Sequence, residues 1–203
     1  FLWLRVNLAW EKCDLPTTQA LVHLVTAVDP RPLYFWLNGA RLLAYDLPAW
    51  RIRALGGEGA GSAALRRRIE REQADAALRY LDRALVYHPQ CAAIYIEMAN
   101  ICLNGRREVA AAANFYRLAA GQPDAPYYAA RIYAELLRRE GRNAEAYAWL
   151  KQLYPTLPKA VQGAKADEAT AAEVEMAMAP VVLQRIRELE VELKIPANQR
   201  FRP

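Results

Sequence analysis

Residues 141–158 read GRNAEAYAWLKQLYPTLP, a helix-forming run that follows a glycine and ends at a proline. Two stretches upstream have the same layout: RREVAAAANFYRLAAGQP at 106–123 and EQADAALRYLDRALVYHP at 72–89. Their final prolines, at positions 89, 123 and 158, are 34 and 35 residues apart. A repeat of about 34 residues is typical of stacked helix–turn–helix units.

Small and bulky residues recur at fixed distances from these prolines. Each copy has an alanine twelve residues before its proline, a bulky residue eight before and an apolar residue five before. The intervals of four and three place these side chains on one face of a helix. We therefore expect the following residues to form the core face of the second helix in each unit: Ala77, Leu81 and Ala84; Ala111, Phe115 and Leu118; Ala146, Leu150 and Leu153.

A second apolar stripe precedes each of these helices and predicts the first helix of the unit. Its members are Trp36, Gly39, Ala40 and Leu43; Tyr95, Met98, Ala99 and Cys102; and Ala130, Tyr133, Ala134 and Leu137. We expect Gly141 to end a helix in the left-handed conformation, and Asp124 with Pro126 to begin one. In the preceding unit the corresponding glycine, Gly105, falls one residue early.

The N-terminal part of the repeat is less regular. Residues 1–12 and the stretch TTQALVHLVTAVDP at 17–30 predict an earlier pair of helices. In the next pair, about 25 residues beyond the regular period separate the first helix from the second, residues 72–89. This insertion, residues 47–71, includes GGEGAGS at 56–62, which we expect to be a flexible loop.

The period, the paired stripes and the proline stops resemble those of the tetratricopeptide repeat family over residues 1–158. The resemblance implies an all-α solenoid of about four antiparallel helix pairs, stacked as a right-handed superhelix with a concave groove. For residues 159–203 we expect C-terminal capping helices and a tail. The first helix would start at about Asp167 and break or kink at Pro180, and an amphipathic run would end near Lys194. A partner-binding helix is the alternative for this region.

Composition places the chain among globular proteins. Hydrophobic residues make up 54% and charged residues 24% of the 203 residues, and the net charge is +5. This mild basic excess favours an acidic partner or an anionic membrane surface, and it is below that of a dedicated nucleic-acid binder. The cysteines Cys13, Cys91 and Cys102 form no paired motif, so we expect buried free thiols. Residues 1–10, FLWLRVNLAW, predict an amphipathic helix rather than a membrane span, which needs about 20 apolar residues.

The sequence offers no recognisable catalytic or metal-binding motif. His23 lies among apolar helix residues and His88 precedes a turn proline, without the spacing of zinc ligands. Ser62 lacks the context of a catalytic nucleophile, and the glycine stretch lacks the Lys-Ser/Thr pair that holds phosphate and magnesium. We therefore expect a non-enzymatic protein with no cofactor, no metal, no small-molecule substrate and no nucleic-acid partner.

In the tetratricopeptide arrangement the first helices line the groove, so the resemblance implies a protein-binding site on their remaining surface. The groove set consists of Tyr34, Leu37, Arg41, Tyr45, Ile96, Asn100, Asn104, Tyr128, Arg131, Glu135 and Arg138, with Arg139 beside it. It is aromatic at one side, amide-bearing in the middle and basic at the other, which suits a peptide backbone and carboxylates. A solvated surface without a ligand is the alternative.

A second basic set flanks the glycine stretch. Its members are Trp50, Arg51, Arg53, Arg66, Arg67 and Arg68. A solvated helix face is one interpretation, since acidic residues follow in the sequence. The other is a contact for an acidic protein or for lipid headgroups, with the tryptophan at the interface.

These observations predict an adaptor that binds a protein partner, as a peptide or a filament, through the groove. Overall size and repeat style are further similar to bacterial kinesin light chains, tetratricopeptide proteins that bind bacterial tubulin filaments and associate with membranes. That similarity implies filament binding, a cytoplasmic location and contact with an anionic membrane. The alternative is a membrane-tethered periplasmic scaffold for envelope assembly or secretion, which an apolar segment of about 20 residues before Phe1 would favour. RNA binding would need base-reading pairs at a fixed place in each unit, and Arg41, Asn100 and Glu135 do not supply them.

Overall fold

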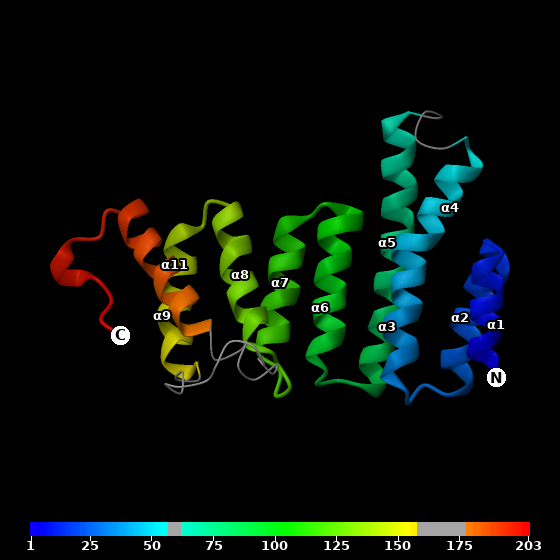
Figure 1. Ribbon diagram of the computed structural model, residues 1–203, viewed down its shortest axis with the longest axis horizontal. Coiled ribbons are helices and arrows are strands. Elements are labelled where there is room, and N and C mark those ends of the chain that lie inside the picture. The colour runs from blue at the N-terminus through cyan, green and yellow to red at the C-terminus, as the bar shows by residue number, and fades with distance from the viewer. Residues whose placement is uncertain (57–61, 158–177) are drawn as a thin grey trace, which may run out of the picture.

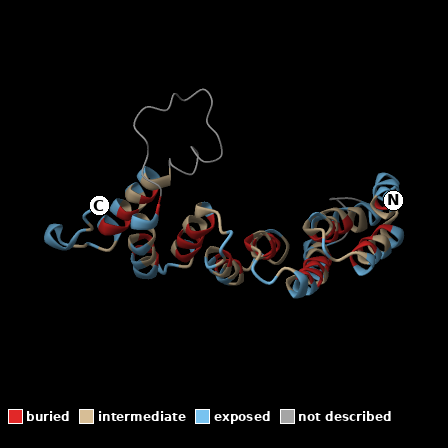
Figure 2. Ribbon diagram, turned by 90° about the horizontal axis from the view of Figure 1, so that it is seen from below, coloured by how far each residue is buried: buried red, intermediate tan, exposed pale blue. Residues whose placement is uncertain are grey.

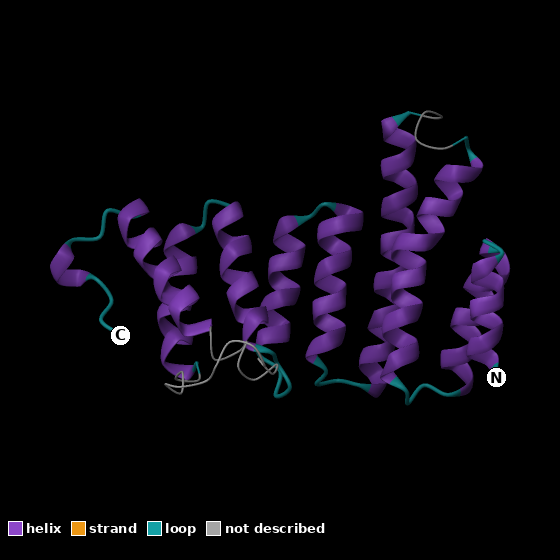
Figure 3. Cartoon of the chain, in the orientation of Figure 1, coloured by secondary structure: helices purple, strands orange, loops and turns teal. Residues whose placement is uncertain are grey.

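Helices make up the regular structure of the chain wherever it is described. The computed structural model describes residues 1–56, 62–157 and 178–203, and these ranges contain no strand (Figure 3). The all-α class expected from the sequence is confirmed for these residues. The helices are α1 Leu2–Glu11, α2 Leu15–Val28, α3 Leu33–Arg41, α4 Leu47–Ala54, α5 Ala63–Tyr87, α6 Ala92–Ile101, α7 Val109–Ala120, α8 Tyr127–Arg139, α9 Asn143–Leu153 and α11 Met178–Glu192.

Shorter turns extend several of these helices. Two π-helical turns, η1 (Leu42–Asp46) and η2 (Cys102–Arg106), continue α3 and α6. Two 3₁₀ turns, η3 (Tyr154–Thr156) and η5 (Ala197–Gln199), follow α9 and α11.

The helices lie side by side in chain order, with the N-terminus at one end of the molecule (Figure 1). α1 packs against α2, α3 against α5, α6 against α7 and α8 against α9, and each pair contacts the next. α11 packs against α9 and α8. Buried residues line the contacts between neighbouring helices, while the outward faces are exposed (Figure 2). The core is therefore a continuous strip along the row, to which each pair contributes one segment.

The first-helix stripes occupy these contacts. Every stripe residue is buried except Tyr95, which is half-buried. In the second helices of the first and third copies, the alanines and leucines at twelve and eight residues before the proline are also buried. This agreement follows from the periodicity, because a stripe with helical spacing can be removed from water only by turning it toward a neighbouring helix.

The middle copy differs from the sequence-based prediction. Phe115, Ala111 and Leu118 are only half-buried, and the buried face of α7 consists instead of Ala112, Ala113, Tyr116 and Ala119. The reason is the length of the turn before the proline. α7 ends three residues before Pro123, whereas α5 ends two residues before Pro89. Alignment on the prolines therefore displaced the predicted face by one residue.

The turn residues act in partly unexpected ways. Gly141 follows α8 with φ +75°, the left-handed conformation that the sequence predicted. The left-handed position after η2 is taken by Arg107, with φ 59°. Gly105 serves close packing instead, because a Cβ there would lie 2.7 Å from the Cβ of Ala74 on α5. A glycine at this position allows η2 to lie directly against α5.

Asp124 does not begin its own helix. α8 starts after Pro126, and the Asp124 carboxylate accepts the backbone N–H of Ala92, at 2.8 Å. Ala92 is the first residue of α6. The N–H groups of a first helical turn have no partner within the helix, so a carboxylate there satisfies one of them and interacts favourably with the helix dipole. Asp124 thus ties the loop before α8 to the start of α6.

Most of the insertion is helical rather than loop. Residues 47–71 form α4 and the start of α5, which project together beyond the row as the α4–α5 hairpin (Figure 1). Ser62 caps α5 by accepting the N–H of Leu65 at 3.2 Å. The centre of the predicted flexible loop, 57–61, lies outside the described residues. So does the expected helix start at Asp167, and Pro180 lies in the first described turn of α11.

Candidate protein-binding face

A buried ion pair joins the first helices of two successive pairs. Arg41, at the end of α3, places its Nε and Nη2 atoms 2.9 Å from Oε2 of Glu97 on α6. Glu97 is only 3% exposed, whereas the side chain of Arg41 is 54% exposed. A carboxylate buried to this degree needs a charged hydrogen-bonding partner, because its desolvation is otherwise uncompensated. Arg41 therefore holds α6 beside α3 and is not a free groove arginine.

Two hydroxyl–amide contacts extend this pair along the same face. The Tyr116 hydroxyl of α7 donates to Oδ1 of Asn100 on α6 at 2.8 Å. The Tyr45 hydroxyl of η1 is hydrogen-bonded to the side chain of Asn104 on η2. We call the residues of these three contacts the Glu97 cluster; they are Arg41, Tyr45, Glu97, Asn100, Asn104 and Tyr116.

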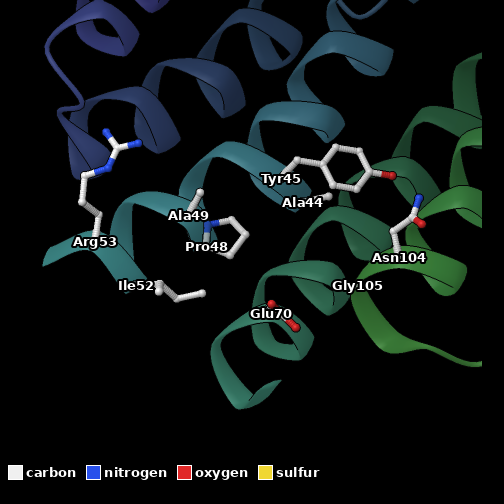
Figure 4. A pocket seen from close by; sticks show the side chains of 9 residues that line it. All are labelled: Ala44, Tyr45, Pro48, Ala49, Ile52, Arg53, Glu70, Asn104 and Gly105. Atoms are coloured by element: carbon white, nitrogen blue, oxygen red, sulfur yellow. The ribbon is translucent and has the colours of Figure 1, made fainter. Parts of the chain in front are cut away.

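The two π-helical turns place Tyr45 and Asn104 opposite each other. In η1 the N–H of Leu47 bonds to the carbonyl of Leu42, five residues back, which is the wide spacing of a π turn. The same kind of turn recurs at the end of α6. Isolated π turns inside helices occur frequently at functional sites. Here they point a hydroxyl and an amide toward one another across two helix pairs (Figure 4).

Burial sets the protonation of the cluster tyrosines. Burial, and then the nearby Tyr128, Glu97 and Tyr45, together raise the pKa of Tyr116 to about 12. Burial, and then the charge of Glu97, likewise raises the pKa of Tyr45. Both hydroxyls therefore stay protonated at neutral pH. Tyr128 lies on α8, which packs against α7, the helix that carries Tyr116.

A pocket of about 420 Å³ opens beside the Tyr45–Asn104 contact. It lies in the angle between α4 and the η2–α5 packing (Figure 4). Its wall combines apolar side chains with a few polar groups: Ala44, Tyr45, Pro48, Ala49, Ile52, Arg53, Glu70, Asn104 and Gly105. Glu70 has an ion partner 3.6 Å away in Arg107, whereas Arg53 is exposed. The pocket thus offers an apolar base with a tyrosine, an amide and an available cation at its edge.

α8 carries the other end of the predicted groove. Tyr128 is exposed, and Arg131, one turn further on, is half-buried with a buried Nε that has no hydrogen-bond partner. Arg138 is neutralised by Glu135 at 3.1 Å and by Glu192 of α11 at 2.9 Å. Glu135 lies 3.5 Å from Arg185 as well. The strongly basic end expected from the sequence is therefore reduced, on the described residues, to Arg131 and the exposed Arg139.

The remaining predicted groove residues are less available. Tyr34 is exposed, but its ring makes edge contacts with Trp3 and Phe35 at 5.7 and 5.6 Å. Leu37 and Ile96 are half-buried against the core. The middle of the predicted set therefore contributes most of the Glu97 cluster, whereas Tyr34, Leu37 and Ile96 make packing contacts.

The second basic set lies on the α4–α5 hairpin. Arg51 and Arg68 both contact Glu72, at 3.2 and 2.8 Å, and Trp50 is half-buried against the core. Arg66 is also engaged in an interaction. Arg53 and Arg67 are the exposed members of the set that make no ion pair with the described residues. The set is therefore a mixed-charge surface and not a uniform cationic patch.

No protein-family model matches the sequence, and comparison with curated proteins gives no match either. The described helices include none that is both long enough and apolar enough to cross a bilayer.

Two central members of the cluster were missed by sequence reasoning. Glu97 is the one charged residue in the α6 sequence AAIYIEMANI, and a lone acidic residue on a largely buried helix indicates a paired carboxylate. Tyr116 was missed because the predicted face of α7 was displaced by one residue. Its partner, Asn100, belongs to the predicted groove set, but the hydroxyl that donates to it does not.

Histidines and cysteines form no metal-binding group among the described residues. His23 accepts a hydrogen bond from Arg83 at Nδ1, at 2.8 Å. The expectation of buried thiols holds for Cys102, but Cys91 is half-buried and Cys13 is exposed. Cys13 adopts φ 50° in the turn between α1 and α2, where the chain has to reverse and the side chain has no core to enter.

Proposed function

We propose that this chain is a non-enzymatic adaptor, a tetratricopeptide-type helical stack that binds an extended acidic segment of a partner protein. The binding face is that of α3, α6 and α8, together with the α4 residues that line the pocket. The observation that carries the proposal is the distribution of charge around the Glu97 cluster. Arg53 at the pocket and Arg131 beside Tyr128 make no ion pair with any described residue, whereas the acidic groups between them are paired.

This arrangement favours a partner with carboxylates. A cation that already has an internal partner gains little from a ligand, whereas an unpaired guanidinium can form bidentate bonds to an incoming carboxylate. The net charge of +5 attracts the same class of partner over longer distances. Beside Arg131, the exposed Tyr128 ring supplies rigid contact area, and the pocket that Arg53 and Tyr45 line can accept a small apolar side chain.

Binding of labelled peptides tests this proposal. The probes are a glutamate-rich peptide with interspersed apolar residues and a second peptide with each glutamate replaced by lysine. Fluorescence anisotropy should show binding of the acidic peptide alone, weakened by salt. Arg131→Glu should reduce its affinity at least about tenfold, because the substitution places like charges together. The control is Arg117→Glu on α7, an exposed arginine bonded only to the neighbouring Asn114 at 3.0 Å.

A second arm identifies the natural partner. Cross-linking from cell extract with wild type and with Tyr128→Ala/Arg131→Glu should capture a protein that the double variant loses, and the purified protein should then bind directly. The bacterial tubulin filament implied by the sequence resemblance is tested by co-sedimentation. Binding that survives the double variant but is lost in Arg67→Glu would overturn this face and transfer the site to the α4–α5 hairpin. Recovery on anionic vesicles alone would favour a membrane contact over a protein partner.

A further inference from the structure

The segment after α11 turns back onto the end of the row and is bound there by specific contacts (Figure 1). The backbone N–H of Phe201 donates to Oε1 of Glu190 at 2.6 Å. The carbonyl of Phe201 accepts from Nη1 of Arg187 at 2.9 Å. Its ring meets Tyr154 edge-on, with 5.4 Å between ring centroids. Both backbone groups and the side chain of one residue are therefore recognised together.

The groups that hold Phe201 belong to the folded helices. Glu190 on α11 is 1% exposed, and its carboxylate also contacts the Tyr147 hydroxyl at 3.3 Å and Arg187 at 2.8 Å. We call Tyr147, Tyr154, Arg187 and Glu190 the Phe201 site. A buried carboxylate is costly unless donors surround it. Loss of the Phe201 N–H would therefore leave the Glu190 carboxylate with one hydrogen-bond donor fewer. The site is thus built to be occupied by a peptide backbone that carries an aromatic ring.

The bound segment is joined to α11 by a short and strained connection. Lys194 has φ 53°, a left-handed conformation that is unfavourable for a non-glycine residue. Between this residue and Phe201, Ile195 lies half-buried against the core, whereas residues 196–200 are exposed, with a local bond from Nε of Arg200 to the carbonyl of Ile195 at 3.3 Å. Beyond Ile195, the segment is therefore held by the Phe201 site rather than by the core.

We propose that the Phe201 site is a peptide-binding site for an aromatic residue flanked by arginines, and that its partner is the corresponding segment of a second copy of this chain. In one copy the segment fills the site of its own chain. When that contact opens, the same residues of another copy fit the same donors and acceptors, since exchange of identical elements needs no new complementarity. This site lies on α9, η3 and α11, apart from the α3–α6–α8 face, so the inference does not depend on the proposed function.

Competition within the chain determines what an experiment shows. A tethered segment acts at a high effective concentration, which for short linkers is about millimolar. A free peptide therefore binds the wild-type site weakly. Its apparent affinity is its intrinsic affinity multiplied by the fraction of time for which the site is empty. Phe201→Ala removes the ring of the internal ligand and leaves every residue of the site in place.

The first test uses a labelled synthetic peptide with the sequence of residues 197–203, ANQRFRP, and full-length chains. The peptide should bind Phe201→Ala at least about tenfold more tightly than wild type. A peptide with alanine in place of its phenylalanine should not bind. Tyr154→Leu combined with Phe201→Ala should lose binding, and it leaves the buried carboxylate untouched, so that a folded protein can be checked by circular dichroism.

The second test asks for the partner directly. Phe201→Ala has an intact site without its ligand, and Tyr154→Leu has an intact segment with an impaired site. Mixed at high concentration, the two variants should form a one-to-one complex by light scattering, while each alone remains unchanged. No saturable binding of the peptide to Phe201→Ala, or equal binding of the alanine peptide, would overturn the site. Peptide binding without a mixed complex would overturn the second copy as the partner.

Discussion

Arg41 and Glu97 lie 56 residues apart in the sequence and form an ion pair that links α3 to α6. The two residues come from different helix pairs, so their contact fixes one pair relative to the next. The carboxylate is buried and the guanidinium is half in solvent. The pair therefore combines a stabilising role between units with a position at the centre of the proposed binding face.

Arg41→Met should destabilise the chain by about 1–3 kcal/mol, less than for a fully buried pair because water already reaches the arginine. The loss arises because Glu97 is left buried without a partner. Arg41→Met/Glu97→Met should recover most of the stability, since an apolar pair of similar volume has no charge to desolvate. Urea unfolding of the wild type, both single variants and the double variant measures the coupling. If the losses of unfolding free energy in the two single variants simply add in the double variant, the two residues are not coupled.

The extent to which the sequence predicted this structure differs from helix to helix. Apolar stripes located the first helices correctly, because burial of a stripe is a local property of its spacing. The left-handed turn at Gly141 was also predicted correctly, because it depends only on the backbone conformation of that one residue. Asp124 was assigned to the wrong helix, because its acceptor role is completed by Ala92, which is far away in the sequence. Contacts of this kind depend on how units stack, and no single repeat contains that information.

For the candidate site, too, the sequence predicted the local features but not the contacts between helices. Periodicity placed Tyr45, Asn100 and Asn104 on one side of their helices, and the structure brings them together. It did not reveal that Glu97 neutralises Arg41 or that Glu135 and Glu192 neutralise Arg138. A charge on a helix face can be read from the sequence, but its partner on another helix cannot. The free charges of the face were therefore overestimated.

Gly105→Ala should destabilise the chain by about 1–3 kcal/mol, the usual cost of forcing an extra methyl into a packed contact. The new Cβ would lie 2.7 Å from the Cβ of Ala74, and neither atom can rotate away. Gly121→Ala is the matched control, because its nearest neighbour would be a carbonyl oxygen at 3.5 Å. That change should stay within about 0.5 kcal/mol. Thermal and urea unfolding of both variants gives the comparison, and equal stabilities would show that η2 does not pack tightly on α5.

Stability should fall as the pH drops below about 6.5, through His23. Burial, and then the charge of Arg83, lowers the pKa of His23 below its ordinary value of 6.5. Above pH 6.5 the imidazole is neutral in both folded and unfolded chains, and the hydrogen bond from Arg83 to Nδ1 is intact. Below that pH the unfolded chain binds the proton first, so the folded state loses stability down to the folded pKa. Melting temperatures from pH 8 to pH 5 should show a steeper fall for wild type than for His23→Gln. Parallel curves would exclude the histidine as the cause.

The three thiols should react at very different rates with a thiol reagent at pH 8. Burial raises the pKa of Cys102 to about 11, so this residue is both enclosed and almost entirely protonated. Cys13 is exposed in a turn and should react first, with Cys91 between the two. Cys13→Ser should remove the fast phase and leave the slow one unchanged. In urea all three should react quickly, which separates protection by the fold from intrinsic reactivity. A fast phase that persists in Cys13→Ser/Cys91→Ser would show that η2 opens readily in the folded chain, against its stable packing on α5.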